Sequence, residues 1–364
     1  MKVLTLSQAI TGRLSKDELE RLEVSDQWPR LSLFEKTLNS DMLNERFLDN
    51  VLNIRKIIYR KLPIHIAQVV EAYFIQKHYD VIISWAENLG LPFAALMNLT
   101  DIRKPHIGIF SWISKPKKAI VLRIVQSKFD RIVLMSSAQR DYAVNTIRIP
   151  ENKIAFLRWP VDLKYWRPMN EGPMDMICSV GREMRDYGTL ISAVKDLDIN
   201  CHIAAGGLTM GNKKDAWIKQ IGGLDKLPVN VTVGKKTYPE LRMLYARSKF
   251  VVIPILPTNT DNGTTSILEA MSMGKAVICS KTEGQRDVIQ DGKNGIFVPP
   301  NDIGSMREAI TYLLANPDIA ARMGNEGRKY VERFHSLDEY VLKIQGIVEE
   351  EVMNSQLGIN KQNN

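Results

Sequence analysis

Short apolar runs alternate with helix-like segments along almost the whole chain, and this alternation limits the possible folds more than any other feature. Apolar runs of four to seven residues that lack a polar face are typical of strands buried on both sides. Intervening segments long enough to form a helix indicate parallel strands with crossover connections. The pattern therefore predicts an α/β protein with parallel sheets covered by helices. The expected strands are residues 3–6, 81–84, 107–110, 132–135, 154–157, 174–180, 200–204, 229–233, 250–253, 276–279 and 295–298.

The expected strands form two blocks separated by a proline- and glycine-containing segment at residues 166–173. A chain of 364 residues is long enough for two domains of ordinary size. We therefore predict two Rossmann-like, doubly wound domains, residues 1–168 and 169–336, with ligands at the carboxyl ends of the strands. The final helical segment, 337–353, is expected to pack back on the first domain. Residues 17–49 carry no pattern that assigns them to an element.

The composition is that of a globular protein, with 45% apolar and 25% charged residues. The longest apolar stretch, 81–99, is interrupted by Glu87, Asn88 and Pro92, so it is not expected to span a bilayer. The first residues predict a strand and not a signal peptide. These observations favour a cytoplasmic protein.

Three cysteines lie far apart in apolar segments, which predicts core thiols in a reducing compartment. Five histidines show no ligand spacing, so the sequence predicts no zinc site. The cysteines are Cys178, Cys201 and Cys279.

The net charge of +8 is confined to the first half of the chain. Residues 1–170 hold 26 Lys and Arg against 17 Asp and Glu, whereas residues 171–364 hold 23 against 24. The basic residues concentrate in 55–61 and 115–131, which we interpret as helices with basic and apolar faces. Such helices can lie on an anionic membrane surface, but a solvated helix face is the more common explanation of such a pattern. No recognition motif supports nucleic-acid binding.

The segment from Asp261 to Glu269 contains a candidate ligand site. An apolar run, 250–255, precedes it, and Gly263, Thr264 and Thr265 stand where a helix should begin. A strand, a glycine-containing loop and a helix N-terminus can bind phosphate, because free backbone N–H groups and the helix dipole point at the anion. An ordinary helix N-cap explains the threonines without a ligand.

The chain also resembles the GT-B-fold retaining glycosyltransferases of group 1 (family 4), whose fingerprint is Glu, seven residues, Glu. The resemblance is strong over residues 174–335 and weaker over 79–170. It rests on Asp261, seven residues and Glu269; on Val180-Gly181-Arg182 with Arg185; on Glu283-Gly284-Gln285; on Asp291-Gly292-Lys293-Asn294-Gly295; and on Pro160-Val161-Asp162 with Trp166-Arg167-Pro168.

The resemblance implies two domains facing a cleft and a donor site in the second domain. Arg182 and Arg185 would neutralise the donor diphosphate, which suits the bidentate guanidinium group. Asp261 would contact hydroxyls of the transferred sugar, and Glu269 would hold the ribose. The backbone around the phosphates would come from Gly181, Gly263, Thr264 and Thr265.

The implied reaction is transfer of a hexosyl group from a nucleotide-diphosphate sugar to an acceptor hydroxyl with retention of the anomeric configuration. The donor would be a UDP- or GDP-sugar, with no bound cofactor and no metal, because arginines and a helix N-terminus can stabilise the leaving phosphate. The acceptor would be a carbohydrate or a lipid-linked chain in polysaccharide or glycolipid assembly. With the basic first half, this suggests a peripheral position at the inner face of the membrane.

Three departures from the family pattern keep alternatives open. Asp261 is one methylene shorter than the usual Glu, Ser111 stands where many members carry a histidine, and Gly12 alone can serve for the usual Gly-Gly loop. His106 is expected in a strand, and Glu87 either faces the acceptor or caps the helix that follows. The alternatives are a donor-binding subunit that has lost catalysis and a GT-B nucleotide-sugar epimerase.

Overall fold

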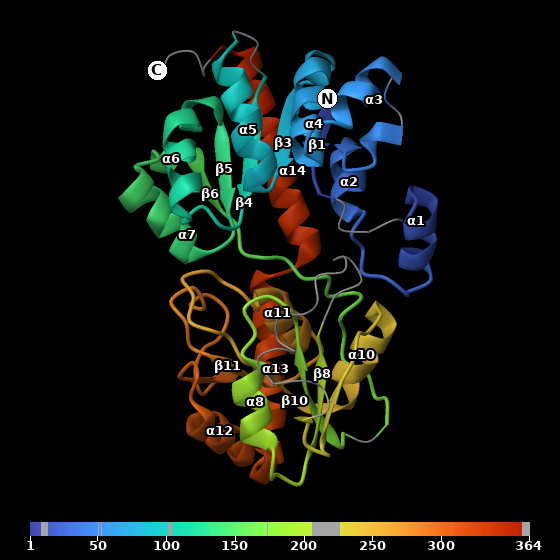
Figure 1. The fold of residues 1–364 in the computed structure, drawn as a ribbon, viewed down its shortest axis with the longest axis vertical. Coiled ribbons are helices and arrows are strands. Elements are labelled where there is room, and N and C mark those ends of the chain that lie inside the picture. The colour runs from blue at the N-terminus through green and yellow to red at the C-terminus, as the bar shows by residue number, and fades with distance from the viewer. Residues whose placement is uncertain are drawn as a thin grey trace. The chain divides into compact units, whose positions relative to one another are not determined.

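The structure is a computed structural model that describes residues 1–8, 14–49, 51, 53–100, 104–172, 174–205 and 226–358. The chain divides into two compact units (Figure 1). The N-terminal unit comprises Met1–Thr11, Leu31–Arg158 and Asp338–Asn364, and the C-terminal unit comprises Gly12–Arg30 and Trp159–Leu337. The division at Arg158 precedes the expected domain boundary at residue 168, and the segment 12–30 belongs to the C-terminal unit.

Six parallel strands form the sheet of the N-terminal unit in the order β2-β1-β3-β4-β5-β6. The α/β class with parallel sheets, predicted from the alternation, is confirmed. The edge strand β2 was not predicted, because its sequence, Ser-Asp-Met-Leu, has no apolar run. The strands are β1 (Val3–Leu6), β2 (Ser40–Leu43), β3 (Val81–Trp85), β4 (His106–Phe110), β5 (Arg131–Leu134) and β6 (Ile154–Phe156).

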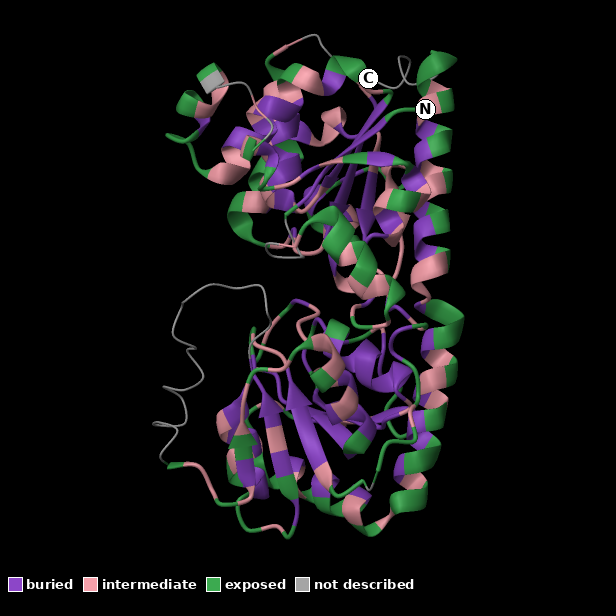
Figure 2. Cartoon of the chain, turned by 90° about the vertical axis from the view of Figure 1, so that its right-hand side faces the viewer, coloured by how far each residue is buried: buried purple, intermediate pink, exposed green. Residues whose placement is uncertain are grey.

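Helices cover both faces of this sheet (Figure 2). The contacts place α4 beside α5 and α5 beside α6, so the three helices form one layer. The helices of the unit are α2 (Leu33–Leu38), α3 (Asn53–Tyr59), α4 (Ile64–Ile75), α5 (Glu87–Asn98), α6 (Pro116–Val125), α7 (Ser137–Tyr142) and α14 (Leu337–Gln356). Shorter turns are η1 (Phe47–Asp49), η2 (Gln76–His78), η3 (Gln126–Lys128), η4 (Ala143–Ile147) and η5 (Glu151–Lys153).

The C-terminal helix α14 packs on the N-terminal sheet through one aromatic and one charged contact. The buried ring of Tyr340 lies 6.4 Å from that of Trp85. Farther along the helix, Arg131 at the start of β5 forms an ion pair of 2.7 Å with the buried carboxylate of Glu351. These contacts account for the assignment of residues from Asp338 onward to the N-terminal unit.

A second sheet of six parallel strands forms the C-terminal unit, in the order β12-β11-β10-β7-β8-β9. Successive side chains of β10 point to opposite faces of this sheet, and both faces are buried. Val251 and Ile253 belong to one buried cluster, and Phe250 and Val252 to another. The strands are β7 (Met176–Val180), β8 (Asn200–Ala204), β9 (Val231–Val233), β10 (Ser248–Ile253), β11 (Val277–Ser280) and β12 (Gly295–Val298). The helices are α1 (Lys16–Val24), α8 (Tyr187–Val194), α10 (Tyr238–Arg247), α11 (Thr264–Ser272), α12 (Ile303–Ala315) and α13 (Pro317–Phe334).

The end of the chain forms three helices in succession. Asn316 separates α12 from α13, which begins at Pro317, and His335 and Ser336 separate α13 from α14. Over the part of the chain that the structure describes, no helix combines the length and apolarity needed to cross a membrane.

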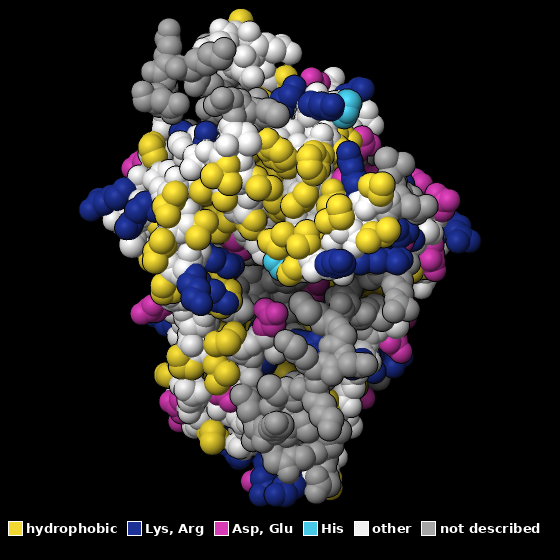
Figure 3. Space-filling model, turned by 45° about the horizontal axis from the view of Figure 1, so that its top comes forward, with side chains coloured by type: hydrophobic (Ala, Val, Ile, Leu, Met, Phe, Trp, Pro, Cys, Tyr) yellow, Lys and Arg dark blue, Asp and Glu magenta, His cyan; other side chains and the backbone are white. Residues whose placement is uncertain are grey.

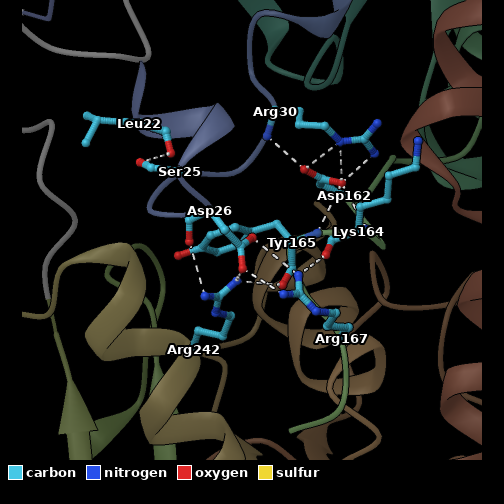
Figure 4. Close-up of polar contacts among 9 residues, drawn as sticks. All are labelled: Leu22, Ser25, Asp26, Arg30, Asp162, Lys164, Tyr165, Arg167 and Arg242. Atoms are coloured by element: carbon cyan, nitrogen blue, oxygen red, sulfur yellow. Dashed lines mark hydrogen bonds and ion pairs between the residues drawn. The ribbon is translucent and has the colours of Figure 1, made fainter. Parts of the chain in front are cut away.

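Residues 17–30, part of the segment that the sequence left unassigned, are held within the C-terminal unit by ion pairs (Figure 4). The buried carboxylate of Asp162 accepts from the backbone N–H of Arg30 at 2.7 Å and from its guanidinium at 2.6 Å. The carboxylate of Asp26 pairs with Arg167 at 2.7 Å and with Arg242 at 3.0 Å. Asp162 and Arg167 lie in the loop that precedes β7, and Arg242 lies on α10.

Candidate donor site at the switch point of the C-terminal sheet

Strands β7 and β10 are neighbours at the centre of the sheet. The strands that follow β7, namely β8 and β9, lie on one side of this pair, and those that follow β10, namely β11 and β12, lie on the other. Doubly wound sheets bind ligands at such a switch point, outside the carboxyl ends of the strands. Residues 181–186 follow β7, and residues 254–263 follow β10. Every donor-side residue predicted from the sequence lies in one of these two loops or in α11.

Arg185 connects the two loops. Its side chain is buried, with the residue only 5% exposed, and Nε donates to the carbonyl of Val180 at 2.9 Å. One Nη donates to Glu183 O at 2.9 Å, and the other donates to the hydroxyl of Ser266 on α11 at 3.3 Å. The backbone of Arg185 also forms an antiparallel bridge with Ile255. The guanidinium group is therefore fixed between the end of β7 and the first turn of α11.

Two glycines make this arrangement possible. Gly181 has a φ of +119°, and a Cβ atom there would lie 2.1 Å from an Nη of Arg185. Gly263, which begins α11, has a φ of +97°, and a Cβ atom would lie 2.8 Å from Cδ1 of Ile255. Both positions need glycine for conformation and for space.

The N-terminus of α11 and the guanidinium group of Arg185 bring two positive features together. An ideal Cβ at Gly263 would lie 3.6 Å from an Nη of Arg185. Among the described residues, no side chain caps the start of α11 by a hydrogen bond. The N–H of Thr264 is bonded to the carbonyl of Asp261, and the N–H groups that follow it in the first turn retain their partial positive charge beside a buried cation. This place favours an anion, and Arg182, half-buried in the same loop, adds a third positive group.

Glu269 lies on the second turn of α11 with its side chain turned inward. The residue is 8% exposed, and its Oε2 accepts a hydrogen bond of 2.9 Å from the hydroxyl of Tyr245. Burial raises the pKa of Glu269 to about 7, while the Tyr245 hydrogen bond and the charge of Arg185 act in the opposite direction. The carboxyl group is therefore partly protonated near neutral pH until a partner stabilises its charge.

Asp261 is oriented by a residue that the sequence did not point to. Its Oδ2 accepts a hydrogen bond from the indole N–H of Trp159. Its backbone carbonyl accepts from the backbone N–H of Thr264 at 3.2 Å and from the hydroxyl of Thr264 at 2.8 Å. The carboxylate thus stands at the end of a closed turn that leads directly into α11.

Thr264 and Thr265 differ in environment. Thr264 is buried, and its hydroxyl also accepts from Nε2 of Gln285 at 3.0 Å. The same Gln285 nitrogen donates to the carbonyl of Asn262 at 2.7 Å. The Thr264 hydroxyl therefore shapes the loop. Thr265 is exposed at the helix N-terminus, so its hydroxyl is the one that can reach a ligand.

Glu87 and Ser111, two residues that the sequence proposes for the acceptor side, lie together in the N-terminal unit. Glu87 is buried at the start of α5, and its Oε1 accepts from the backbone N–H groups of Ser111, at 2.8 Å, and Trp112. Its Oε2 pairs with Nζ of Lys118 at 3.0 Å. The sequence left open whether Glu87 faces the acceptor or caps the helix. Among the described residues no side chain caps the start of α5, and the Glu87 carboxylate instead holds the loop after β4, in which Trp112 lies beneath Lys115.

The remaining predicted features are placed as follows. Gly12 lies outside the described residues. His106 is buried in β4, and its Nε2 is 2.9 Å from the hydroxyl of Ser84. The three cysteines are buried free thiols, as predicted for core residues. Within the ranges given above, no group of three or more His, Cys, Asp or Glu could hold a metal ion.

Sequence analysis missed Trp159 and Tyr245, and it quoted Gln285 within a family motif without giving it a role. All three hold predicted residues in place. Trp159 and Tyr245 are ordinary aromatic residues in sequence, and only the tertiary structure pairs them with carboxylates. The sequence signal for Gln285 is the glycine before it. The structure shows why glycine is needed there, because a Cβ at Gly284 would lie 2.0 Å from the carbonyl of Thr260.

Comparisons with known proteins agree with this geometry. Residues 172–330 match the family model described as "Glycosyl transferases group 1". The chain is 24% identical over 183 residues to an uncharacterized glycosyltransferase, MJ1178, of Methanocaldococcus jannaschii, covering 50% of each. It is 24% identical over 234 residues to the alpha-maltose-1-phosphate synthase of Mycolicibacterium smegmatis, covering 56% of this chain and 59% of the relative. The matched part thus spans about half the length of these relatives.

Solved structures show the same fold over nearly the whole chain. The sucrose-phosphate synthase (tll1590) from Thermosynechococcus elongatus has a TM-score of 0.71 at 15% identity, covering 96% of this chain and 98% of that one. Anabaena Alr3699/HepE, in complex with UDP and glucose, has a TM-score of 0.68 at 14% identity, covering 96% and 99%. The family match thus covers the switch-point loops, within residues 172–330, and the fold of the whole chain is the GT-B fold of these solved glycosyltransferases.

Proposed function

We propose that this chain is a retaining glycosyltransferase that moves a hexosyl group from a nucleotide-diphosphate sugar to an acceptor hydroxyl. The observation that supports it most is the buried guanidinium group of Arg185 against the uncapped N-terminus of α11. A diphosphate compensates both positive features at once. The leaving group of the reaction is such a diphosphate, so charge is stabilised where it develops.

In this proposal the bond between the anomeric carbon and the diphosphate oxygen breaks while the acceptor oxygen bonds to the same face of that carbon. The proton of the acceptor hydroxyl passes to the departing phosphate oxygen. Arg182, Arg185 and the N–H groups of α11 hold the phosphates, so the reaction needs no metal. Asp261, oriented by Trp159, accepts hydrogen bonds from hydroxyls of the transferred sugar.

The proposed donor is a UDP- or GDP-sugar. Glu269 receives the ribose hydroxyls, which donate to its carboxylate and favour the charged form. The structure of Alr3699/HepE with UDP and glucose, on the same fold, supports a uridine nucleotide as the first to test.

The proposed acceptor is a carbohydrate or a lipid-linked chain, as in polysaccharide or glycolipid assembly. The excess of basic residues in the first 170 positions suits an anionic or membrane-borne acceptor. We propose a cytoplasmic protein that works at the inner face of the membrane.

A thermal-shift panel with UDP, GDP, ADP, dTDP and CMP tests the donor site. A nucleotide at a hundred times its Kd stabilises the folded state by about 2.7 kcal/mol. We expect UDP or GDP to raise Tm, and Arg182→Ala to abolish the rise. Arg247→Ala, an exposed arginine at the end of α10 in the same unit, should leave it unchanged. Equal shifts for the two variants would contradict the proposal.

Turnover separates the proposal from its alternatives. A donor-binding subunit without catalysis would bind the nucleotide but release no sugar from any donor and acceptor pair. An epimerase would convert the donor into its stereoisomer with the nucleotide still attached. The proposed transferase releases free nucleotide diphosphate in an amount equal to the sugar transferred.

A further inference from the structure

Two helices of the N-terminal unit turn large aliphatic side chains toward solvent. On α3, Ile54 is 76% exposed, and Ile57 and Ile58 are more than half exposed. On α6, Ile120 and Ile124 are exposed to 60% and 65%. Burying such side chains is favourable, so several of them on one surface of a folded domain indicate a binding surface.

These side chains belong to one layer of helices. Arg55 and Tyr59 of α3 both contact the carboxylate of Glu71 on α4, at 3.2 and 2.7 Å. In turn α4 lies beside α5, and α5 beside α6. Figure 3 shows hydrophobic side chains gathered over this part of the N-terminal unit, with lysines and arginines among them and at their margins. Phe74 on α4 is 52% exposed, and the guanidinium group of Arg55 on α3 lies 5.2 Å from its ring.

The exposed charged side chains of this layer are basic, because its carboxylates, Glu71 on α4 and Glu87 on α5, are buried. Neither α3 nor α6 contains an acidic residue, and the single carboxylate of α4, Glu71, is buried and bonded to α3. The basic residues that flank the isoleucines are Lys56, Arg60 and Lys61 at α3, and Lys117, Arg123 and Lys128 at α6.

Exposed isoleucines together with basic side chains indicate which kind of partner can bind this surface. A second copy of the chain would bring equal positive charges together, so self-association through this face is disfavoured. An anionic bilayer offers phosphates to the lysines and arginines and an apolar boundary to the isoleucines. Long basic side chains can extend to the headgroups while their neighbours lie deeper.

We propose that the N-terminal unit docks on an anionic membrane through the outer faces of α3 and α6. In the docked state the isoleucines enter the boundary between headgroups and acyl chains, and the basic residues pair with lipid phosphates. This inference rests on the proposed function, to which it adds a surface for reaching a lipid-linked acceptor. A helix that lies in the interface needs no membrane-spanning segment.

Co-sedimentation of the full chain with vesicles tests this surface. The probes are vesicles of phosphatidylcholine alone and vesicles with 30% phosphatidylglycerol, at low and at physiological salt. We expect at least about tenfold more protein bound to the anionic vesicles, with binding weakened by salt as for other polybasic surfaces. Absence of wild-type binding to anionic vesicles at low salt would overturn the proposal.

Matched variants separate the apolar from the general electrostatic contribution. Ile120→Ser with Ile124→Ser, and Ile57→Ser with Ile58→Ser, should each reduce the bound fraction several-fold. Leu342→Ser on α14, also 61% exposed but on a helix that packs against the sheet through Trp85, should not. Equal binding of all variants would contradict a role for these helices.

Two measurements on the same preparations complete the test. Sedimentation velocity should give a monomer for wild type; a dimer that the isoleucine variants dissociate would overturn the membrane assignment. The thermal shift with UDP or GDP uses no vesicles and should persist in every variant. Loss of vesicle binding with an intact nucleotide shift would therefore leave the proposed function standing, and loss of the shift alone would not affect the membrane surface.

Discussion

The indole N–H of Trp159 donates a hydrogen bond to the carboxylate of Asp261, and the two residues are 102 positions apart in the chain. The backbone carbonyl of Trp159 in turn accepts from Nδ1 of the buried His335 at 2.7 Å. This bond fixes the backbone that carries the indole ring. Asp261 is one methylene shorter than the Glu of the family pattern, so its position depends on such a donor.

Trp159→Phe is therefore expected to reduce kcat while leaving the nucleotide shift intact. Loss of one hydrogen bond worth about 1.4 kcal/mol in the transition state lowers the rate about tenfold. Steady-state kinetics with the active donor measures kcat and KM, and Trp28→Phe, whose ring packs edge-on against Tyr238, is the control. A kcat equal to that of the control would contradict a positioning role for Trp159.

Gly263→Ala should destabilise the C-terminal unit more than Gly292→Ala. Both glycines have positive φ, +97° and +74°, so each alanine costs about 1 kcal/mol or more of backbone strain. A Cβ at Gly263 also lies 2.8 Å from Ile255, whereas nothing lies within 4 Å at Gly292. Urea unfolding measures both changes. Equal losses of unfolding free energy would show that the loop before α11 can move to accommodate a Cβ atom, so that close packing does not require glycine at position 263.

Much of the fold followed from local pattern. Strand β10, Gly263 and helix α11 are consecutive in the chain, so an apolar run, a glycine and a helical pattern were enough to predict a phosphate-binding turn. The buried strands of both sheets were visible for the same reason. Arg185 was identified by resemblance, because nothing in its neighbours shows that it is buried.

The parts that sequence did not predict depend on contacts between distant residues. Strand β2 lies at the edge of its sheet and has no apolar run, so nothing in the sequence indicated that it pairs with β1. The segment ending at Arg30 is assigned to the C-terminal unit by its pairing with Asp162, which is 132 positions away. The bonds that Glu87 makes to the loop at Ser111 likewise require β3 and β4 to be adjacent.

Glu269 gives the stability of the protein a specific pH dependence. Burial raises its pKa from the usual 4.5 to about 7, so between these values the folded state holds a proton that the unfolded state has released. Its contribution to stability is therefore full below pH 4.5 and is lost as the pH rises to about 7. We expect the free energy of unfolding of wild type, relative to Glu269→Gln, to fall across this range and to level off above it.

Urea unfolding of both proteins at half-unit pH steps measures this difference, in which the other titrating groups cancel. A difference that does not change with pH would mean that Glu269 is ionised throughout. Excess nucleotide diphosphate should flatten the slope, because ribose hydroxyls that donate to the carboxylate favour its charged form.

Asp162→Asn should be far more destabilising than Asp26→Asn. The Asp162 side chain is 3% exposed and bonds both the backbone and the guanidinium group of Arg30, so the change leaves a largely buried cation without its counter-ion, at about 3 kcal/mol or more. The Asp26 side chain is 42% exposed, and its ion pairs are expected to contribute about 1 kcal/mol or less. Thermal and urea unfolding compare the two variants. Similar losses would show that the segment 14–30 is not held mainly by Asp162.

The configuration of the sugar released from the donor tests the central claim most directly. Wild type is incubated with the α-linked donors UDP-glucose, UDP-galactose, UDP-N-acetylglucosamine and GDP-mannose, with a simple alcohol as acceptor, and the anomeric proton of the first product is observed by NMR. The account predicts an α-linked product from the donor whose nucleotide stabilises the protein, and its loss in Arg182→Ala. A β-linked product would contradict retention, and a bound donor that never releases its sugar would contradict catalysis.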